Sequence, residues 1–255
     1  MIDLNILSVD WDYFFPCVDD FDWGHKESML FIEALWIHRW SNRNLITGKY
    51  ARDVVVPNES LLEFFWGGVV KVPPIKICIA ESHAAIIDFM KMVQPSGAKT
   101  RWAVWNFDAH HDLGYGNGKA LQCENWARIG ISDGLIRSYN LVYPGWRRDE
   151  PEQDLYPGKI KSAQFSYHYK PPEHLPYFHC IFVCRSGAWT PSWHDDRWLT
   201  FIGGLKELDP MVWLSKAYQG IALKARAFDL QEAKRHAAWI DEQWNKHNQG
   251  GGQHG

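Results

Sequence analysis

The residues best suited to chemistry lie in one short segment, Asp108-Ala-His-His-Asp112. It follows an apolar run, Trp102 to Phe107, that is typical of a strand buried on both faces, and it precedes a glycine-rich loop. In an extended chain, residues two apart point to the same side, so Asp108, His110 and Asp112 are expected to converge at the strand end. Gathered carboxylates and an imidazole repel one another unless a cation joins them. The segment therefore indicates a metal site, with an acidic loop and a bystander histidine as the alternative.

Further candidate ligands follow two other predicted strands. Asp10 and Asp12 come directly after the apolar run Leu4 to Val9, and nearly all of their neighbours are aromatic. Their spacing puts them on one face of a strand end, and their surroundings argue against two solvated loop aspartates. His83 follows the predicted strand Ile75 to Ile79 at a strand-to-helix junction. A core role is the ordinary interpretation of a lone histidine, but the shared sheet edge favours metal ligation.

Length and composition bound the class of protein. The chain has 255 residues, no segment resembling a linker, and a net charge of -3. We expect one domain over residues 1–249 and a disordered tail over 250–255. The charge provides no basic field for nucleic acid, so no nucleic-acid partner is expected.

Cysteine usage and hydropathy bound the compartment. The five cysteines form no Cys-x-x-Cys pair and leave an odd one out, which is typical of a reduced intracellular protein without a disulfide framework. The amino-terminal segment lacks the basic and apolar regions of a signal peptide. No run of about eighteen apolar residues exists, so no membrane span is expected. The sequence predicts a cytoplasmic protein.

Strands alternate with helices along the chain, which predicts an α/β fold with a mostly parallel sheet. The expected strands cover residues 4–9, 75–79, 102–107, 139–144 and 179–185, and the expected helices cover 27–40, 58–66, 84–92, a segment beginning at 209, and 229–247. The stretch 144–176 is expected to be a long loop with little regular structure, and such loops often wall a binding site. The adjacent Asp195 and Asp196 would face opposite ways on a strand, so they form a poorer ligand pair.

This arrangement of motifs resembles the arginase–agmatinase–deacetylase fold, a three-layer α/β fold with a mostly parallel sheet. Three features carry the resemblance: Asp108-Ala-His-His-Asp112, Ser8-Val-Asp-Trp-Asp12, and His83 at its junction. Family ureohydrolases hold two manganese ions with four aspartates and two histidines. Carried over residue by residue, the resemblance implies the ligands Asp10, Asp12, His83, Asp108, His110 and Asp112. Such oxygen-rich ligation suits Mn²⁺ better than Zn²⁺.

A tighter resemblance covers about residues 75 to 147. Its motifs are Glu81-Ser-His-Ala, Asn106-Phe-Asp-Ala-His-His-Asp-Leu, Glu124-Asn-Trp and Tyr143-Pro-Gly-Trp. They are similar to an arginase-like branch that includes peptide arginases, which convert arginine side chains in ribosomal peptides to ornithine. This resemblance implies an arginine-containing precursor peptide as the partner. The implied substrate-binding residues are Glu81, Glu124, Asn125 and Trp126.

Two features depart from true arginases. The Asp-x-Asp strand comes first in this chain, whereas in arginases it follows the Asp-x-His-x-Asp strand; a circularly permuted chain would still fill the same slot in the sheet. The histidine that shuttles protons in arginases is missing, and Glu124 occupies roughly its place.

The resemblance implies a binuclear manganese hydrolase that releases urea from peptidyl-arginine and leaves ornithine. Glu124 is expected to pair with the guanidinium or to shuttle a proton to the leaving amine, with a helix-capping role as the alternative. Asp112 or its neighbour His111 is expected to hold the attacking water by a hydrogen bond. The aromatic residues that suit a peptide groove, or that alternatively pack the long loop on the sheet, are Tyr167, Tyr169, Trp189, Trp193 and Trp198.

Two other classes remain open from the sequence. One is a deacetylase-type amide hydrolase with a single Zn²⁺, in which Asp12 and His83 would be spare. The other is a non-catalytic peptide-binding module that kept the fold, which has no need of two ions. The oligomeric state, a homo-oligomer included, is also left open.

Overall fold

The computed structural model describes residues 2–16, 32–41, 48–69, 76–97, 99–114, 119–149, 165–208, 213–214 and 221–250. Its centre is a seven-stranded sheet of order β5-β4-β3-β1-β6-β2-β7, in which every described strand pair is parallel. The strands are β1 (Ile2–Asp10), β2 (Lys76–Ala80), β3 (Thr100–Phe107), β4 (Ile136–Val142), β5 (Phe165–His168), β6 (Cys180–Cys184) and β7 (Trp213–Leu214).

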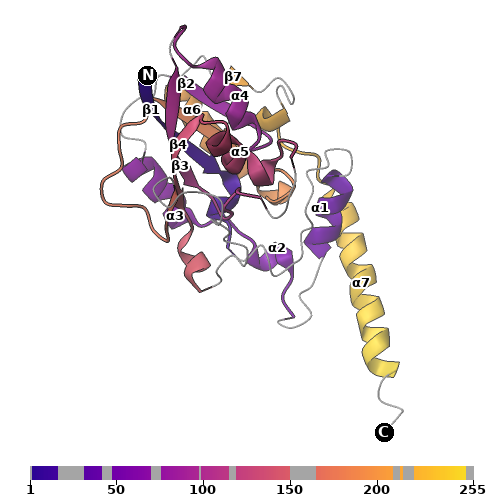
Figure 1. Ribbon diagram of the computed structural model, residues 1–255. Helices are drawn as coiled ribbons and strands as arrows, with labels where there is room; N and C mark the ends of the chain where they lie inside the picture. The colour runs from indigo at the N-terminus through magenta and orange to yellow at the C-terminus, as the bar shows by residue number, and fades with distance from the viewer. Residues whose placement is uncertain are drawn as a thin grey trace.

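Helices connect these strands and cover the sheet (Figure 1). The α-helices are α1 (Ile32–Ser41), α2 (Ala51–Val54), α3 (Glu59–Phe64), α4 (Ala85–Met92), α5 (Trp126–Ser132), α6 (Asp195–Leu208) and α7 (Leu230–Gly250). The shorter helical turns are η1 (Trp11–Phe14), η4 (Phe65–Val69), η5 (Cys123–Asn125), η6 (Gly145–Arg148), η8 (Ser192–His194) and η10 (Ile221–Leu223). Side-chain caps define two of the starts. Asn58 accepts the backbone N–H of Leu61 before α3, and Asp229 accepts those of Gln231 and Glu232 at the start of α7.

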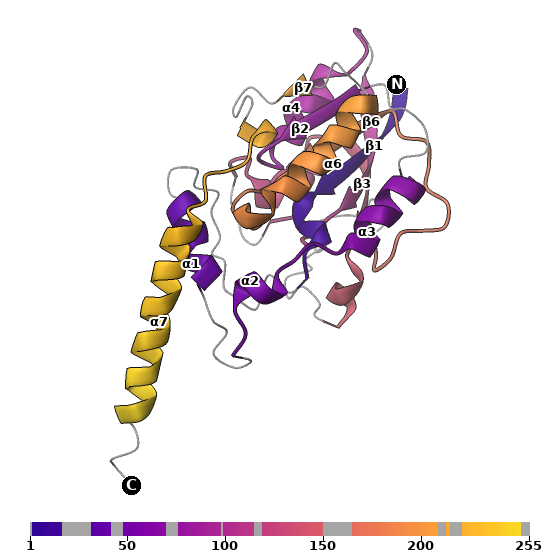
Figure 2. The same ribbon diagram turned by 180° about the vertical axis from the view of Figure 1, so that it is seen from behind.

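The molecule has three layers, with α4 and α5 on one face of the sheet and α3 and α6 on the other (Figures 1 and 2). Because side chains alternate along a strand, each buried strand contributes side chains to the hydrophobic core on both faces of the sheet. On β6, Phe182 packs with the helices α4 and α5, whereas Ile181 and Val183 pack toward α6. The three-layer α/β fold with a parallel sheet is thereby confirmed.

The last helix, α7, packs along α1 and extends away from the sheet (Figures 1 and 2). Ser41 links the pair, because its hydroxyl donates to the carbonyl of Ala233 at 3.1 Å. Within the described residues, no helix is both long and apolar enough to cross a membrane. The helix runs to Gly250, and the rest of the expected tail, residues 251–255, lies outside the described residues.

Helix α6, in which Asp195 and Asp196 form the first turn, was not expected from the sequence, although the apolar spacing of Trp198, Phe201, Ile202 and Leu205 marks one face of a helix. Two expectations about elements are wrong. β5 lies inside the stretch expected to be a loop and pairs with β4. Trp213 and Leu214 form strand β7 where a helix from Asp209 was expected, while residues 209–212 lie outside the described residues.

The sheet order brings four strand ends together. β1, although first in the chain, lies between β3 and β6, and β2 lies beside β6. Because these strands are parallel, the residues that follow Asp10, Ala80, Phe107 and Cys184 meet at one edge. Cys78, Cys123, Cys180 and Cys184 are free thiols, and Cys17 lies outside the described residues.

Candidate metal centre

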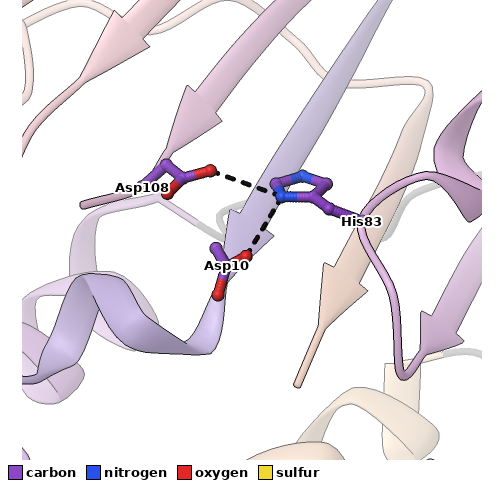
Figure 3. Close-up of side chains that lie close together, drawn as sticks. All are labelled: Asp10, His83 and Asp108. Atoms are coloured by element: carbon purple, nitrogen blue, oxygen red, sulfur yellow. Dashed lines mark hydrogen bonds and ion pairs between the residues drawn. The ribbon is translucent and has the colours of Figure 1, made fainter. Parts of the chain in front are cut away.

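The first group of donors surrounds the imidazole of His83, which lies beyond the carboxyl end of β2. Its Nδ1 is 3.1 Å from Oδ2 of Asp10, 3.3 Å from Oδ2 of Asp108 and 3.1 Å from Oδ2 of Asp112. Figure 3 shows the imidazole of His83 facing Asp10 and Asp108 from across the strand ends. All four side chains are buried. Asp10, His83 and Asp108 are close enough together to hold one metal ion.

The second group adjoins the first. Nδ1 of His110 lies 2.8 Å from Oδ2 of Asp12 and 3.8 Å from Oδ1 of Asp108. These three residues could also hold one metal ion. Asp108 therefore belongs to both groups, since its Oδ2 faces His83 and its Oδ1 faces His110. Two donor groups that share one carboxylate form the candidate metal centre.

The local backbone, and not strand alternation, divides the ligands between the groups. β3 ends at Phe107, and the loop that follows turns so that the backbone N–H of His110 donates to Oδ1 of Asp108 at 2.7 Å. Asp112 has a φ of 52°, in the left-handed region that non-glycine residues rarely adopt. Asp10 ends β1, while Asp12 lies in the turn η1 and donates its N–H to Oδ1 of Asp10. The expected convergence is therefore met in part: Asp108 shares one group with His110 and faces His83 together with Asp112. Asp10 and Asp12, in contrast, turn toward different groups.

Burial and mutual repulsion set the electrostatics of the four carboxyl groups. Burial is the largest cause that raises the pKa of Asp10, Asp12, Asp108 and Asp112. For Asp108, burial and then the charges of Asp112 and Asp10 raise the pKa to about 7. Burial alone would lower the pKa of His83, but its hydrogen bonds to Asp10, Asp108 and Asp112 raise it well above the usual value. Such a concentration of desolvated negative charge is what a bound divalent cation relieves.

Other polar side chains hold the candidate ligands in place. Ser8 Oγ lies 2.7 Å from Nε2 of His83, and the Nδ2 of Asn106 donates to Oδ2 of Asp108 at 2.9 Å. The hydroxyl of Ser186 donates to Oδ2 of Asp10, and the indole N–H of Trp126 donates to Oδ2 of Asp112. Ser8, Asn106 and Ser186 were not predicted to have these roles. Ser8 precedes Asp10 by two residues on β1, and Asn106 near the end of β3 precedes Asp108 by two residues, which is a signal that could have identified them.

Two residues expected to bind substrate, Asn125 and Trp126, are buried beside the candidate metal centre and in the loop before α5. Trp126 is fully buried and stacks on the imidazole of His83, with ring centroids 4.8 Å apart. Asn125 is also buried and closes the preceding loop, because its side chain accepts the N–H of Gln122 and donates to the carbonyl of Ala120. Their expected role in substrate binding stays a prediction.

The other two expected substrate residues, Glu81 and Glu124, differ in their burial and in their partners. Glu81 is buried in an ion pair with Arg185, 2.7 Å between Oε2 and Nη2, and so anchors the sheet edge. Its Oε1 lies against Gly187, where an added Cβ would be 2.0 Å away, so that position needs glycine. Glu124 is half-buried in η5 and accepts the thiol of Cys123 at 3.4 Å. The hydrogen bonds that cap this junction come from Asn125, so the alternative that Glu124 is the helix cap is not supported.

His111, expected to act in catalysis, is fully buried within the metal-binding loop. Its Nδ1 accepts the backbone N–H of Leu113 at 2.9 Å, and its carbonyl accepts the hydroxyl of Tyr139 at 3.0 Å. Tyr139 also accepts a hydrogen bond from Asn106, the residue that holds Asp108. The described contacts of His111 therefore fix the shape of the loop.

The aromatic residues expected to line a groove occupy several places. Trp198 is fully buried beneath α6, and Trp193 packs against Trp36 and Phe228. Tyr167 and Tyr169 are in edge contact, with ring centroids 5.7 Å apart, beyond the metal centre on β5 and the residues that follow it. Of the five, Trp189 is the one that contacts a candidate ligand, His110.

No protein-family model, curated protein or solved structure matches this chain. What the centre can do therefore follows from its own donors. Oxygen and imidazole donors in two adjoining groups can hold metal ions, and their burial excludes water from most of the cluster.

Proposed function

We propose that the protein is a binuclear manganese-dependent hydrolase that converts peptidyl-arginine to ornithine with release of urea, as in the maturation of ribosomal peptides. The observation that carries this proposal is the position of Asp108 between the two donor groups. A shared carboxylate is the usual bridge between paired metal ions. The resemblance of the motifs to arginase-like enzymes supplies the choice of substrate.

The donor set fits two divalent manganese ions. Asp10, His83, Asp108 and Asp112 would hold one ion, and Asp12, Asp108 and His110 the other. The four carboxylates balance the charge of two divalent cations, and a set dominated by oxygen donors suits Mn²⁺. When bound, such a pair of ions acts as a Lewis acid and lowers the pKa of a coordinated water.

The chain's own residues would orient the substrate and move the proton. Glu124 is half-buried in the turn η5, which leads directly into the buried Trp126. A carboxylate there could pair with the guanidinium, since planar guanidinium and carboxylate groups form paired hydrogen bonds. The same group could donate a proton to the leaving amine. The buried Trp126 and His111 would keep water from the far side of the ligands.

The two rival classes account less well for this geometry. A deacetylase-type site with one Zn²⁺ would leave Asp12 and His83 spare, yet His83 faces three carboxylates and Asp12 contacts His110. A non-catalytic peptide-binding module has no need of four buried carboxylates whose burial opposes ionisation. We therefore prefer the binuclear hydrolase.

Metal analysis combined with mass spectrometry tests the proposal. The purified protein should retain two manganese ions per chain, and with Mn²⁺ it should remove CH₂N₂ from each modified arginine of an arginine-containing peptide. Urea should appear in equal amount, and free arginine should be a slow substrate or none. A manganese-loaded protein that releases urea from neither peptide nor free arginine would overturn the proposal. A higher kcat/KM for free arginine would make the protein an ordinary arginase.

A further inference from the structure

The candidate metal centre is open to solvent at one ligand. The side chain of His110 is 18% exposed, whereas the side chains of the other five ligands are at most 8% exposed. A substrate that reaches the cluster must therefore approach past His110. Groups that border this imidazole are the ones that a substrate meets.

Trp189 borders His110 at this opening. The ring centroids of the two side chains are 5.5 Å apart, with an angle of 51° between the ring planes. Trp189 is partly buried, with one part of the indole packed on the hydrophobic core beside α6. Trp189 is thus partly exposed, and it contacts the ligand that has the largest exposed fraction among the six candidate ligands.

The turn that carries Trp189, residues 186–190, is held rigidly from outside. Within the turn, the backbone N–H of Trp189 donates to the carbonyl of Ser186 at 2.7 Å. The carbonyls of the same turn accept hydrogen bonds from buried side chains of other elements. These are Trp36 to Gly187 at 2.8 Å, Arg39 to Ala188, and Arg226 to Thr190 at 2.8 Å. A ring fixed in this way can bind a ligand without first being ordered.

We propose that Trp189 is a specificity-determining residue whose indole binds the guanidinium of the substrate by stacking at the entrance to the metal centre. The proposal rests on the proposed function. A planar guanidinium stacks on aromatic faces and is attracted by the ring quadrupole, most strongly by tryptophan. Trp189 thereby selects a cationic side chain over a neutral one of the same shape.

Substitution of the ring separates stacking from simple packing. In Trp189→Leu, KM for an arginine-containing peptide should rise about tenfold, equivalent to about 1.4 kcal/mol, with kcat within about threefold and both metal ions retained. Trp189→Phe should show a smaller rise, because the weaker aromatic ring is kept. A peptide with citrulline in place of arginine is neutral, so its inhibition constant should change little in either variant. Trp239→Leu, at a 58% exposed tryptophan on α7, is the matched control.

Several outcomes would overturn the assignment of Trp189. An unchanged KM in Trp189→Leu would do so. So would a loss of affinity for the citrulline peptide as large as the loss for the arginine peptide, because that result indicates apolar contact only. Loss of manganese from the variants would show that the ring positions His110 and does not contact substrate. If the wild-type protein releases no urea, the proposed function fails, and calorimetric binding of the arginine peptide to the manganese-loaded protein decides the matter. Tenfold weaker binding by Trp189→Leu then supports the stacking role, and equal or absent binding overturns it.

Discussion

Ser8 engages the nitrogen of His83 that faces away from the carboxylates, with Oγ 2.7 Å from Nε2. This leaves Nδ1 directed at Asp10, Asp108 and Asp112. For Nδ1 to bind a cation it must be without a proton, so the proton must be on Nε2 and Ser8 must accept it. The serine thus selects the imidazole tautomer that a metal needs.

Ser8→Ala should weaken metal binding at the His83 group by about 10–100-fold, the usual effect of losing a partner that orients a ligand. Competition with a chelator of known affinity measures the change. Ser41→Ala is the matched control, because Ser41 is also fully buried but bonds to Ile37 and Ala233 on the distant helix pair. Equal metal affinity in Ser8→Ala and the control would show that Ser8 does not orient the imidazole.

The shared position of Asp108 predicts unequal metal contents in two aspartate variants. Asp108→Asn should lose both ions, because this carboxylate belongs to both donor groups. Asp12→Asn should lose one ion and keep the one held by the His83 group. Elemental analysis after dialysis counts the ions, with Asp88→Asn, at an exposed residue of α4, as the control. Full occupancy in Asp108→Asn would contradict a shared ligand.

The raised pKa of Asp108 predicts how the stability of the metal-free protein depends on pH. Its folded pKa of about 7 lies above the ordinary value of 3.8, so between these values the folded state binds the extra proton and stability falls as pH rises. The raised pKa of His83 acts in the same direction, since its stabilising charge is present at low pH and is lost as pH rises through the raised value. Added Mn²⁺ should therefore raise Tm more at pH 8 than at pH 5.5.

Other histidines oppose this trend, so the comparison needs a variant. Burial lowers the pKa of His38 and His194, and their protonation favours the unfolded state at low pH. The quantity to measure is the difference in Tm between the metal-free wild type and metal-free Asp108→Asn across pH 5 to 8. The wild type should lose stability relative to the variant as pH rises. The opposite slope would rule out a raised pKa for Asp108.

Ser186 allows the hydroxyl contact and the backbone strain to be separated. Its φ is 48°, and its hydroxyl donates to Asp10. Ser186→Ala and Ser186→Gly both remove this hydrogen bond, so both should bind metal about tenfold more weakly. Glycine adopts this φ without strain, so the free energy of unfolding of the metal-free Gly variant should exceed that of the Ala variant by about 1 kcal/mol. Chemical denaturation and chelator competition measure the two effects, and equal stabilities would argue against strain.

Glu124→Gln keeps the shape of the side chain and removes its charge. If Glu124 pairs with the guanidinium or shuttles the proton, urea release should fall by about two or more orders of magnitude with metal content unchanged. The matched control is Glu232→Gln, at an exposed residue in the first turn of α7. Turnover close to that of the wild type would leave the proton shuttle to another residue.

Much of this centre could be predicted from the sequence because the ligands follow buried strands. Apolar runs that stop at Asp10, Asp108 or the residues before His83 identify strand ends, and parallel strands bring such ends together. The three-layer fold follows from the same alternation of strands and helices. These inferences need only local patterns of residues.

The remaining features depend on contacts between distant segments. Ser186 contacts Asp10, and Trp189 contacts His110, because β6 lies beside β1. No local pattern of residues predicts this order of the strands. The division of Asp10 from Asp12 depends on a turn of η1, whereas the prediction assumed an extended chain. The stacking of Trp126 on His83 likewise follows from the packing of α5 on the sheet.

The central place of β1 also bears on how the protein folds during synthesis. Of the described strands, β1 comes first in the chain and so leaves the ribosome before the others, yet Ile2 pairs with Thr100, and Ile6 pairs with Cys180. Its apolar residues must therefore wait for partners made much later, and pairing over such sequence distances is slow. A nascent chain would expose this strand until β6 emerges, which makes it a natural site for chaperone binding or misassociation. All six candidate ligands precede β6 in the chain, but Ser186, which donates a hydrogen bond to Asp10, follows it.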